Sequence, residues 1–294
     1  MKTIKIIRTS LILAFSITLL AHSYAGNNVP DQKLLYKVVG EDSLYLHVFE
    51  PEVHKGVNSA IIFFFGGGWV SGSPAQFYQQ SEYLASRGML AISAEYRVKK
   101  KHGTSPFDCV EDAKSAVRWV RQHATELHID PNKIVASGGS AGGHIALCTA
   151  LIVGLDNTTE EASISSVPNA VVAYNPVLDT TEKGYGHEKV KGRETEISPC
   201  HQIKKDAPPM LLFHGKEDKT VPFENAVRFN TLSQAAGNDC ELIAFDGVDH
   251  GFFNGDFFRG KGDKYFNLTM YDTDVFLSQR GYLKGKPTLP KNIK

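Results

Sequence analysis

The segment Gly138-Gly139-Ser140-Ala141-Gly142 constrains the fold more than any other part of the chain. The run before it, residues 133–137, contains Ile and Val and favours a strand, whereas the run after it, residues 144–150, favours a helix. A strand can pass into a helix through so short a turn only where side chains are absent, because Cβ atoms would clash there. The segment therefore predicts a chain in which strands and helices follow one another closely.

The rest of the sequence repeats this alternation. Strand-like apolar runs occupy 60–65, 89–94, 170–174, 210–213 and 240–245, and helical patterns occupy 77–86, 107–127, 224–236 and about 264–279. Two further strand-like runs, 34–39 and 43–49, flank a Gly-containing turn and predict a β-hairpin. We expect one α/β domain with a mostly parallel central sheet, an antiparallel amino-terminal hairpin, and helices on both faces.

Ser140 is the central residue of a G-x-S-x-G motif. On such a turn the serine Oγ projects above the carboxyl edge of the sheet, where it can act as a nucleophile. The N–H of Ala141 opens the following helix and points to the same space, which favours negative charge there. The motif also occurs by chance in turns rich in Gly and Ser, so its chemistry depends on an acid and a base elsewhere in the chain.

Candidates for the acid and the base follow two later strands. Asp218 lies just after the strand at 210–213, and its neighbour Glu217 is the competing choice, although we favour Asp218. His250 lies just after the strand at 240–245. Each residue alone is compatible with a turn, a surface or a core role. Together, in the order Ser, Asp, His and at the carboxyl ends of strands, they predict a catalytic triad.

Three consecutive glycines follow the first of the buried strands and precede Trp69. Glycines allow backbone N–H groups to point inward and form an anion-binding nest. We expect the N–H groups of Gly67 and Gly68, together with that of Ala141, to form an oxyanion hole, and Trp69 to contact substrate. The alternative is a tight turn without a catalytic role.

With these residues in view, the chain resembles the α/β-hydrolase superfamily. More narrowly, it is similar to esterases with an HGGG-type oxyanion loop and a GxSxGG elbow, which include hormone-sensitive-lipase-like esterases and bacterial carbohydrate acetyl esterases. The resemblance extends from about Leu44 to Phe253. It implies the α/β-hydrolase fold, Ser140 as nucleophile, Asp218 in D-x-x-V-P as acid and His250 in H-G-F as base. It also implies the three oxyanion donors named above, and no metal or organic cofactor.

Two features depart from the family pattern. Phe65 stands where the family often has a histidine that braces the oxyanion loop, so the loop must be supported differently here. The large amino-terminal cap of hormone-sensitive-lipase-like enzymes is lacking, and the insert at 179–209 is expected to lie on the elbow side, as a lid or with short helices of its own. These features predict an open, shallow pocket. Arg97 and Asp112 also resemble a structural pair of the family, with ordinary surface positions as the alternative.

The sequence therefore predicts a serine esterase that hydrolyses short-chain acyl esters. A small acyl group on a bulky alcohol, such as a sugar chain, suits an open pocket, and this favours a carbohydrate acetyl esterase acting on a small-molecule or polysaccharide ester. The alternatives are an aryl or lipid carboxylesterase, a serine peptidase of the prolyl-oligopeptidase type, and a non-catalytic binding protein on the same fold. The natural ester, the acyl length and the oligomeric state stay open.

Residues 1–25 have the pattern of a secretory signal peptide. Three cations precede an apolar stretch, 11–21, which is too short to span a bilayer, and the segment ends in the small residue Ala25. Cleavage before Gly26 would leave a single domain, 26–294, exported to the periplasm or the outside of the cell. The alternative is an uncleaved membrane anchor.

Charge and cysteine content restrict the remaining possibilities. The formal net charge is zero for the whole chain, and about −3 without the leader, which carries three cations and no acid. No basic run stands out, which argues against nucleic acid as a partner, and no second apolar segment predicts stable membrane insertion. The spacings of the four cysteines match no zinc pattern, and Cys148 is expected to be a small buried hydrophobe. Export would permit disulfides, but their pairing stays open for Cys109, Cys148, Cys200 and Cys240.

Overall fold

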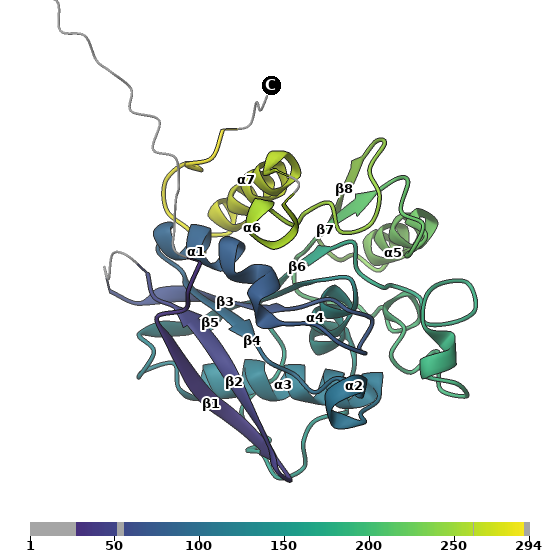
Figure 1. Cartoon of the computed structure of the whole chain (residues 1–294), viewed down its shortest axis with the longest axis horizontal. Coiled ribbons are helices and arrows are strands. Elements are labelled where there is room, and N and C mark those ends of the chain that lie inside the picture. Colours follow the sequence, from purple (N-terminus) through teal and green to yellow (C-terminus); the bar gives the residue numbers. More distant parts are fainter. Residues whose placement is uncertain (1–27, 52–55, 261, 291–294) are drawn as a thin grey trace, which may run out of the picture.

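The computed structural model describes residues 28–51, 56–260 and 262–290, so the predicted signal peptide lies outside the described residues. Within them, eight strands form one sheet in the order β1-β2-β4-β3-β5-β6-β7-β8 (Figure 1). The strands are β1 (Gln32–Val39), β2 (Asp42–Phe49), β3 (Asn58–Phe64), β4 (Leu90–Ala94), β5 (Ile129–Gly139), β6 (Ala170–Tyr174), β7 (Met210–Gly215) and β8 (Cys240–Phe245).

The sheet is antiparallel at one edge and parallel elsewhere. Strand β2 pairs antiparallel with both β1 and β4, whereas β4, β3, β5, β6, β7 and β8 form a continuous parallel series. The predicted amino-terminal hairpin and mostly parallel sheet are therefore confirmed. Since the carboxyl ends of parallel strands meet at one edge, the loops after β3, β5, β7 and β8 are brought close together.

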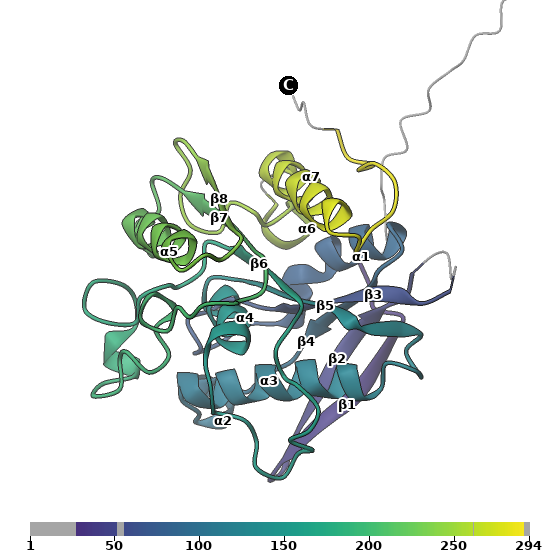
Figure 2. The same ribbon diagram turned by 180° about the vertical axis from the view of Figure 1, so that it is seen from behind.

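Helices cover both faces of the sheet, as expected. The α-helices are α1 (Tyr78–Ser86), α2 (Lys99–His102), α3 (Pro106–Gln122), α4 (Ala141–Leu151), α5 (Phe223–Ala235), α6 (Asp256–Arg259) and α7 (Lys264–Gln279), and the 3-10 helices are η1 (Pro74–Phe77), η2 (His187–Lys189) and η3 (Pro199–His201). Figures 1 and 2 show α1 and α7 on one side of the sheet and α3 and α4 on the other.

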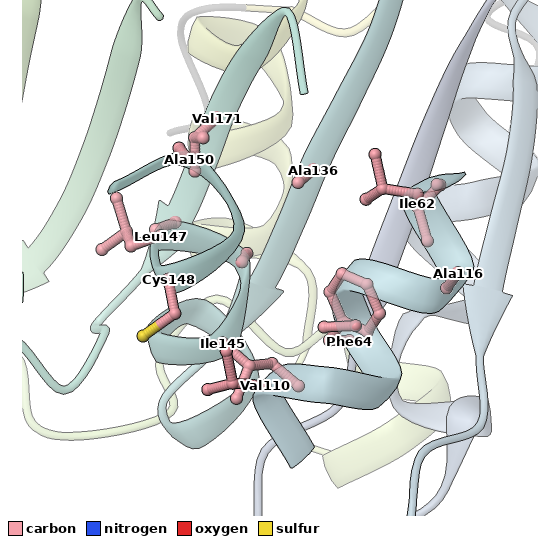
Figure 3. Packing of buried hydrophobic residues seen from close by; sticks show 14 of the residues in the cluster. Ile62, Phe64, Val110, Ala116, Ala136, Ile145, Leu147, Cys148, Ala150 and Val171 are labelled. Atoms are coloured by element: carbon pink, nitrogen blue, oxygen red, sulfur yellow. The ribbon is translucent and has the colours of Figure 1, made fainter. Parts of the chain in front are cut away.

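The central strands are buried on both faces, which explains their continuous apolar runs. Ile62 and Phe64 of β3 pack in one cluster with residues of α3 and α4, such as Val110 and Ile145 (Figure 3). The intervening Phe63 belongs to a second cluster with α1 and α7. Alternate side chains of the same strand thus hold a helical layer on each face of the sheet.

Two local predictions need correction. The helix predicted over 107–127 ends at Gln122, because the chain must turn there to enter β5, and His128 takes a positive φ of 52° at the end of that turn. The helix predicted from Phe77 is preceded by η1, which Ser73 caps by accepting a hydrogen bond from the N–H of Ala75.

The insert 179–209 leaves the carboxyl end of β6 and contains η2 and η3. It is anchored near its beginning, where the buried Asp179 carboxylate forms an ion pair with Arg228 of α5 at 2.7 Å and Thr180 donates a hydrogen bond to the carbonyl of Glu194. One residue of the insert, Tyr185, lines the cavity beside Ser140. The expectation that the insert lies on the elbow side and carries short helices is therefore confirmed.

Candidate active site

The turn between β5 and α4 holds Ser140 in a backbone conformation that L-amino acids rarely adopt. Its φ is 55° and its ψ is −120°, and a non-glycine residue at positive φ costs about 1–3 kcal/mol. The flanking glycines let neighbouring backbones approach, since a Cβ on Gly138 would lie 2.5 Å from the carbonyl oxygen of Phe64. The turn thereby places the serine hydroxyl at the carboxyl edge of the sheet, at the start of a helix.

The structure brings Ser140, His250 and Asp218 together from three separate loops. His250 Nε2 lies 2.9 Å from Ser140 Oγ, and His250 Nδ1 lies 2.7 Å from Asp218 Oδ2. The other carboxylate oxygen of Asp218 accepts hydrogen bonds from the N–H groups of Thr220 and Val221 at 2.9 and 2.8 Å. The neighbouring Glu217 is exposed. Of the two acids considered, Asp218 is therefore the one that faces the imidazole.

The surroundings of Asp218 keep its carboxyl group charged. Burial alone would raise the pKa of Asp218, but hydrogen bonds from His214, His250 and the N–H of Val221 outweigh it and hold that pKa well below its ordinary range. An ionised carboxylate only accepts hydrogen bonds, so Nδ1 of His250 must carry the proton that lies between them. Nε2 is then free to accept the proton of Ser140, which is the tautomer that a general base needs.

His214 is also part of this arrangement, and no motif had indicated it. It is fully buried on β7, and its Nε2 lies 3.4 Å from Asp218 Oδ2 and 3.0 Å from the carbonyl oxygen of Val221. Its imidazole therefore contacts the loop that carries Asp218 at two points, Asp218 itself and Val221. Its position four residues before Asp218 was the signal that could have identified it.

The glycine loop after β3 exposes backbone N–H groups to the same space. Gly67 and Gly68 have φ values of 122° and 62°, which only glycine adopts readily. Among the described residues, none accepts a hydrogen bond from their N–H groups. Ala141 is the first residue of α4, so its N–H has no acceptor within the helix. A cavity of about 220 Å³ is lined by Gly67, Gly68, Ser140 and His250, so two of the three predicted donors border it. The third, Ala141, directly follows Ser140 in the chain.

The loop is braced by buried amide side chains in place of the histidine that the family pattern has there. Gln76 of η1 accepts a hydrogen bond from the N–H of Gly66 at 2.6 Å and donates to Asn254 Oδ1 at 3.0 Å. Asn254 in turn donates to the carbonyl of Gly251 at 2.7 Å, next to His250. The oxyanion loop and the histidine loop are therefore joined by one chain of hydrogen bonds. No motif in the sequence indicated Gln76 or Asn254.

Phe65 is supported by an aromatic neighbour. The hydroxyl of Tyr96 donates to the carbonyl of Phe65 at 2.6 Å, and the two rings stack with centroids 4.2 Å apart. The adjacent Arg97 contacts Asp112 through Nε and Nη2, both at 2.8 Å, and both residues are buried. The structure therefore contains the pair that the resemblance implied, and a surface role for it is excluded.

Trp69 does not reach the cavity, so the prediction that it contacts substrate is corrected. Its side chain is 1% exposed, and its ring meets that of His144 edge-on at 4.9 Å. The positive φ of Trp69, 61°, turns the ring into the core beneath the insert. The aromatic residues that line the cavity are Phe253 and Tyr185, and the sequence motifs indicated neither of them as a substrate contact. A Cβ on Gly68 would lie 2.6 Å from the hydroxyl oxygen of Tyr185.

Three further observations concern cofactors, thiols and membranes. Among the described residues, no group of three or more His, Cys, Asp or Glu side chains is arranged to hold a metal ion. All four cysteines are buried and free, and burial raises the pKa of the Cys148 thiol well above its ordinary value. In the part of the chain that the structure describes, no helix has the length and apolarity to cross a membrane.

Comparison with known proteins shows that this chain is similar to esterases. The BD-FAE family profile matches residues 46–232. The isoprenylcysteine alpha-carbonyl methylesterase of Arabidopsis thaliana is 27% identical over 84% of this chain and 62% of the relative. The acetylxylan esterase of Xylanibacter ruminicola is 27% identical over 72% of this chain and 44% of the relative. The chain thus spans about half the length of the curated relatives it matches.

A solved structure matches this chain over nearly the full length of both proteins. The apo form of Thermogutta terrifontis esterase 2 superposes with a TM-score of 0.83 and 46% sequence identity, over 90% of this chain and 99% of that one. The same esterase is known in a form phosphorylated by paraoxon and in propionate-bound and butyrate-bound forms. These structures share the α/β-hydrolase architecture described above.

Proposed function

The chain belongs to the BD-FAE family and shares the α/β-hydrolase fold of known esterases, and from this premise we propose that it is a serine esterase for short-chain acyl esters. The observation that carries the proposal is the continuous hydrogen-bonded series Ser140, His250 and Asp218, with distances of 2.9 and 2.7 Å, beside a glycine loop with free N–H groups. A serine, an oriented base and oxyanion donors are the parts that acyl transfer requires.

In the proposed mechanism, Ser140 Oγ attacks the ester carbonyl carbon while His250 Nε2 takes its proton. Asp218 keeps the imidazole oriented and stabilises its charged form. The N–H groups of Gly67, Gly68 and Ala141 bind the negative oxygen of the tetrahedral intermediate. His250 then gives the proton to the leaving alcohol oxygen as the acyl-enzyme forms. Water repeats the sequence in the second half, releasing the acid and restoring the serine.

We infer further that the acyl group is short and that the alcohol is a carbohydrate. The cavity beside Ser140 has a volume of only about 220 Å³, which suits a small acyl group. Thermogutta terrifontis esterase 2 binds propionate and butyrate, and one relative is an acetylxylan esterase. The share of that relative's length that is covered is 44%, so its substrate enters here only as support for the proposal.

Export is also a proposal. It rests on residues 1–25, with three cations before an apolar stretch and a small residue before Gly26. The mass of the protein recovered from the periplasm or the culture medium tests it, and a mature amino terminus at Gly26 is the expected result. Recovery of the full-length chain in the membrane fraction would instead favour an uncleaved anchor.

Hydrolysis of p-nitrophenyl esters of increasing acyl length tests the esterase proposal. We expect the highest kcat/KM for acetate to butyrate. Ser140→Ala should lower the rate at least about 10³-fold and Asp218→Asn by roughly 10⁴-fold, because the nucleophile and the orientation of its base are lost. Glu217→Gln is the matched control and should retain activity, because Glu217 is exposed and does not face His250.

The variants also define how the proposal fails. Undiminished hydrolysis by Ser140→Ala would remove the serine mechanism, and cleavage of peptides without cleavage of esters would favour a peptidase. A preference for long acyl chains would favour a lipid esterase. Release of acetate from acetylated polysaccharides, compared with acetylated phenols, separates the carbohydrate proposal from an aryl esterase.

A further inference from the structure

A second cavity adjoins the one that contains Ser140. It has a volume of about 350 Å³, and His250, Gly251 and Arg259 line both cavities. The second cavity extends away from the glycine loop, toward Phe252, Lys264 and Tyr265. The imidazole therefore stands at the junction between two spaces, one containing the serine and the oxyanion donors and the other bordered by the segment after β8.

The direction of proton transfer assigns a role to this second cavity, on the basis of the function proposed above. His250 Nε2 must donate its proton to the leaving alcohol oxygen, so that oxygen has to lie within hydrogen-bonding distance of the imidazole. The acyl group occupies the space beside the glycine loop, where its oxygen meets the N–H donors. The alcohol portion of the ester then extends along the side of His250, into the second cavity.

The side chains in the second cavity indicate which alcohol it accepts. Arg259 is exposed and forms an ion pair with none of the carboxylates that the structure describes. Its guanidinium lies close to the histidine loop, since a Cβ on Gly251 would be 3.2 Å from Nη2. Lys264 adds a second cation, with Nζ 5.4 Å from the centre of the Tyr265 ring. A guanidinium in this position is suited to bind a carboxylate through two parallel hydrogen bonds.

The acidic residue in the same lining, Asp249, is hydrogen-bonded to backbone N–H groups. Asp249 Oδ1 accepts hydrogen bonds from the N–H groups of His250 and Lys219 at 2.7 and 3.2 Å. The backbone of the loops that carry the triad therefore holds this carboxylate oxygen, and among the described residues Asp249 forms no ion pair with Arg259 or Lys264, which line the same cavity.

Two aromatic side chains complete the lining. The rings of Phe252 and Tyr265 meet edge-to-face, with centroids 5.9 Å apart and an angle of 89° between their planes. Aromatic surfaces of this kind pack against apolar ring faces while polar groups around them bind substituents. We propose that this cavity binds an alcohol that carries a carboxylate, and that its natural occupant is a uronic acid residue of an acylated carbohydrate, with Arg259 and Lys264 as the carboxylate-binding residues.

Pairs of esters that are alike except at one carboxylate group test the proposal. One pair is 4-acetoxybenzoate and its neutral methyl ester, and the other is a singly O-acetylated methyl glucuronoside and the corresponding O-acetylated methyl glucoside. We expect the wild type to have a higher kcat/KM for the charged member of the sugar pair, and this preference should weaken with added salt.

Substitutions then assign the preference to residues. Arg259→Gln should lower the charged-to-neutral ratio of kcat/KM by about tenfold, since a hydrogen-bonded charge contributes about that factor. Lys264→Gln should lower the ratio by less, because one exposed cation contributes less than a bidentate pair. Lys133→Gln is the control: its Nζ donates to the carbonyl of Gly281 at the opposite edge of the sheet, and the ratio should not change.

Three outcomes would overturn parts of this proposal. A ratio near one in the wild type, or an equal loss on both members in Arg259→Gln, overturns the proposed carboxylate site. A preference confined to the benzoate pair overturns the uronic acid assignment. These outcomes are distinct from failure of the esterase proposal, which would appear as hydrolysis of all four esters by the Ser140→Ala variant.

Discussion

The two walls of the active-site cavity are held in place in different ways. The wall that carries Ser140 and the glycine loop is built from buried strands and a buried helix, and Gln76 and Asn254 join its loops through hydrogen bonds at 2.6 to 3.0 Å. The second wall is the side where Tyr185 reaches the cavity from the insert 179–209, which has two short 3-10 helices and many exposed residues. The residues that border the second cavity from the other side of His250 are similar, since Arg259 and Lys264 are both exposed.

This contrast indicates that one wall supports the chemical steps and the other selects the substrate. Bond making and breaking requires atoms held to within a fraction of an ångström, which a packed core and buried hydrogen bonds provide. Substrate choice requires side chains that can be exchanged without disturbing that geometry, and exposed segments provide these. We therefore expect substitutions in the first wall to change kcat and substitutions in the second wall to change the preference among esters.

The largest effect on stability is expected at His144, where the two walls meet. His144 is fully buried on α4, and its Nε2 lies 2.7 Å from the carbonyl oxygen of Ile197 in the insert. Burial lowers its pKa to about 4, although the hydrogen bond to Ile197 opposes this. The unfolded chain binds the proton near pH 6.5, so stability is lost as the pH falls from about 6.5 to about 4. The loss should reach about 3 kcal/mol.

Chemical denaturation at pH 7 and at pH 4 measures this loss. His144→Gln keeps a neutral donor for the Ile197 carbonyl and should reduce the difference in unfolding free energy between the two pH values by about 3 kcal/mol. His187, which is exposed in η2, provides the control, and His187→Gln should leave the difference as in the wild type. An unchanged difference in His144→Gln would show that this histidine is not buried in its neutral form.

The sequence predicted the parts of the fold and site that depend on local pattern. Continuous apolar runs predicted strands β6 and β8 with their observed bounds, and the helical pattern predicted α7 from Lys264 to Gln279. The G-x-S-x-G motif and the order of acid and base led to Ser140, Asp218 and His250. The strands and helices were predictable because each signal is carried by neighbouring residues. The three side chains come together because the carboxyl ends of parallel strands converge.

The residues that the sequence did not indicate act through long-range contacts. Gln76 and Asn254 lie 178 positions apart, and nothing in the glutamine's neighbours shows that its amide meets an asparagine near the catalytic histidine. Trp69 was misplaced because its positive φ turns the ring into the core, and a tryptophan after three glycines has no local signature of that conformation. Side-chain direction at irregular positions is therefore the part that pattern alone cannot supply.

Gln76 and Asn254, the amide side chains that support the oxyanion loop, are expected to have the largest effect on kcat outside the catalytic residues. Gln76→Ala leaves the N–H of Gly66 without its acceptor and breaks the link to Asn254, so the oxyanion loop loses its fixed orientation. We expect kcat for p-nitrophenyl acetate to fall about 10- to 100-fold with KM nearly unchanged, because the affected interaction forms mainly in the transition state. Steady-state kinetics, with thermal unfolding to verify the fold, measure this split.

A second variant tests whether the two amides act as a unit. Asn254→Ala should have a similar effect, and the double variant should be little worse than the stronger single one, since both break the same chain of hydrogen bonds. Gln234→Ala on α5, which removes a hydrogen bond to the carbonyl of Cys240, is the matched control and should retain kcat. Strictly additive losses in the double variant would contradict a shared bracing role.

The smallest effect is expected at the wall formed by the insert. Tyr185 lines the cavity beside Gly68, and its hydroxyl accepts a hydrogen bond from Lys189 Nζ at 3.0 Å. Tyr185→Phe removes one neutral hydrogen-bonding group and keeps the ring, so we expect changes of about two- to tenfold in kcat/KM between acetate and butyrate esters. The kcat for acetate should change much less than in Gln76→Ala. A loss of kcat as large as that of Gln76→Ala would mean that the insert takes part in oxyanion stabilisation. The chemical steps and substrate selection would then not be assigned to separate walls of the cavity.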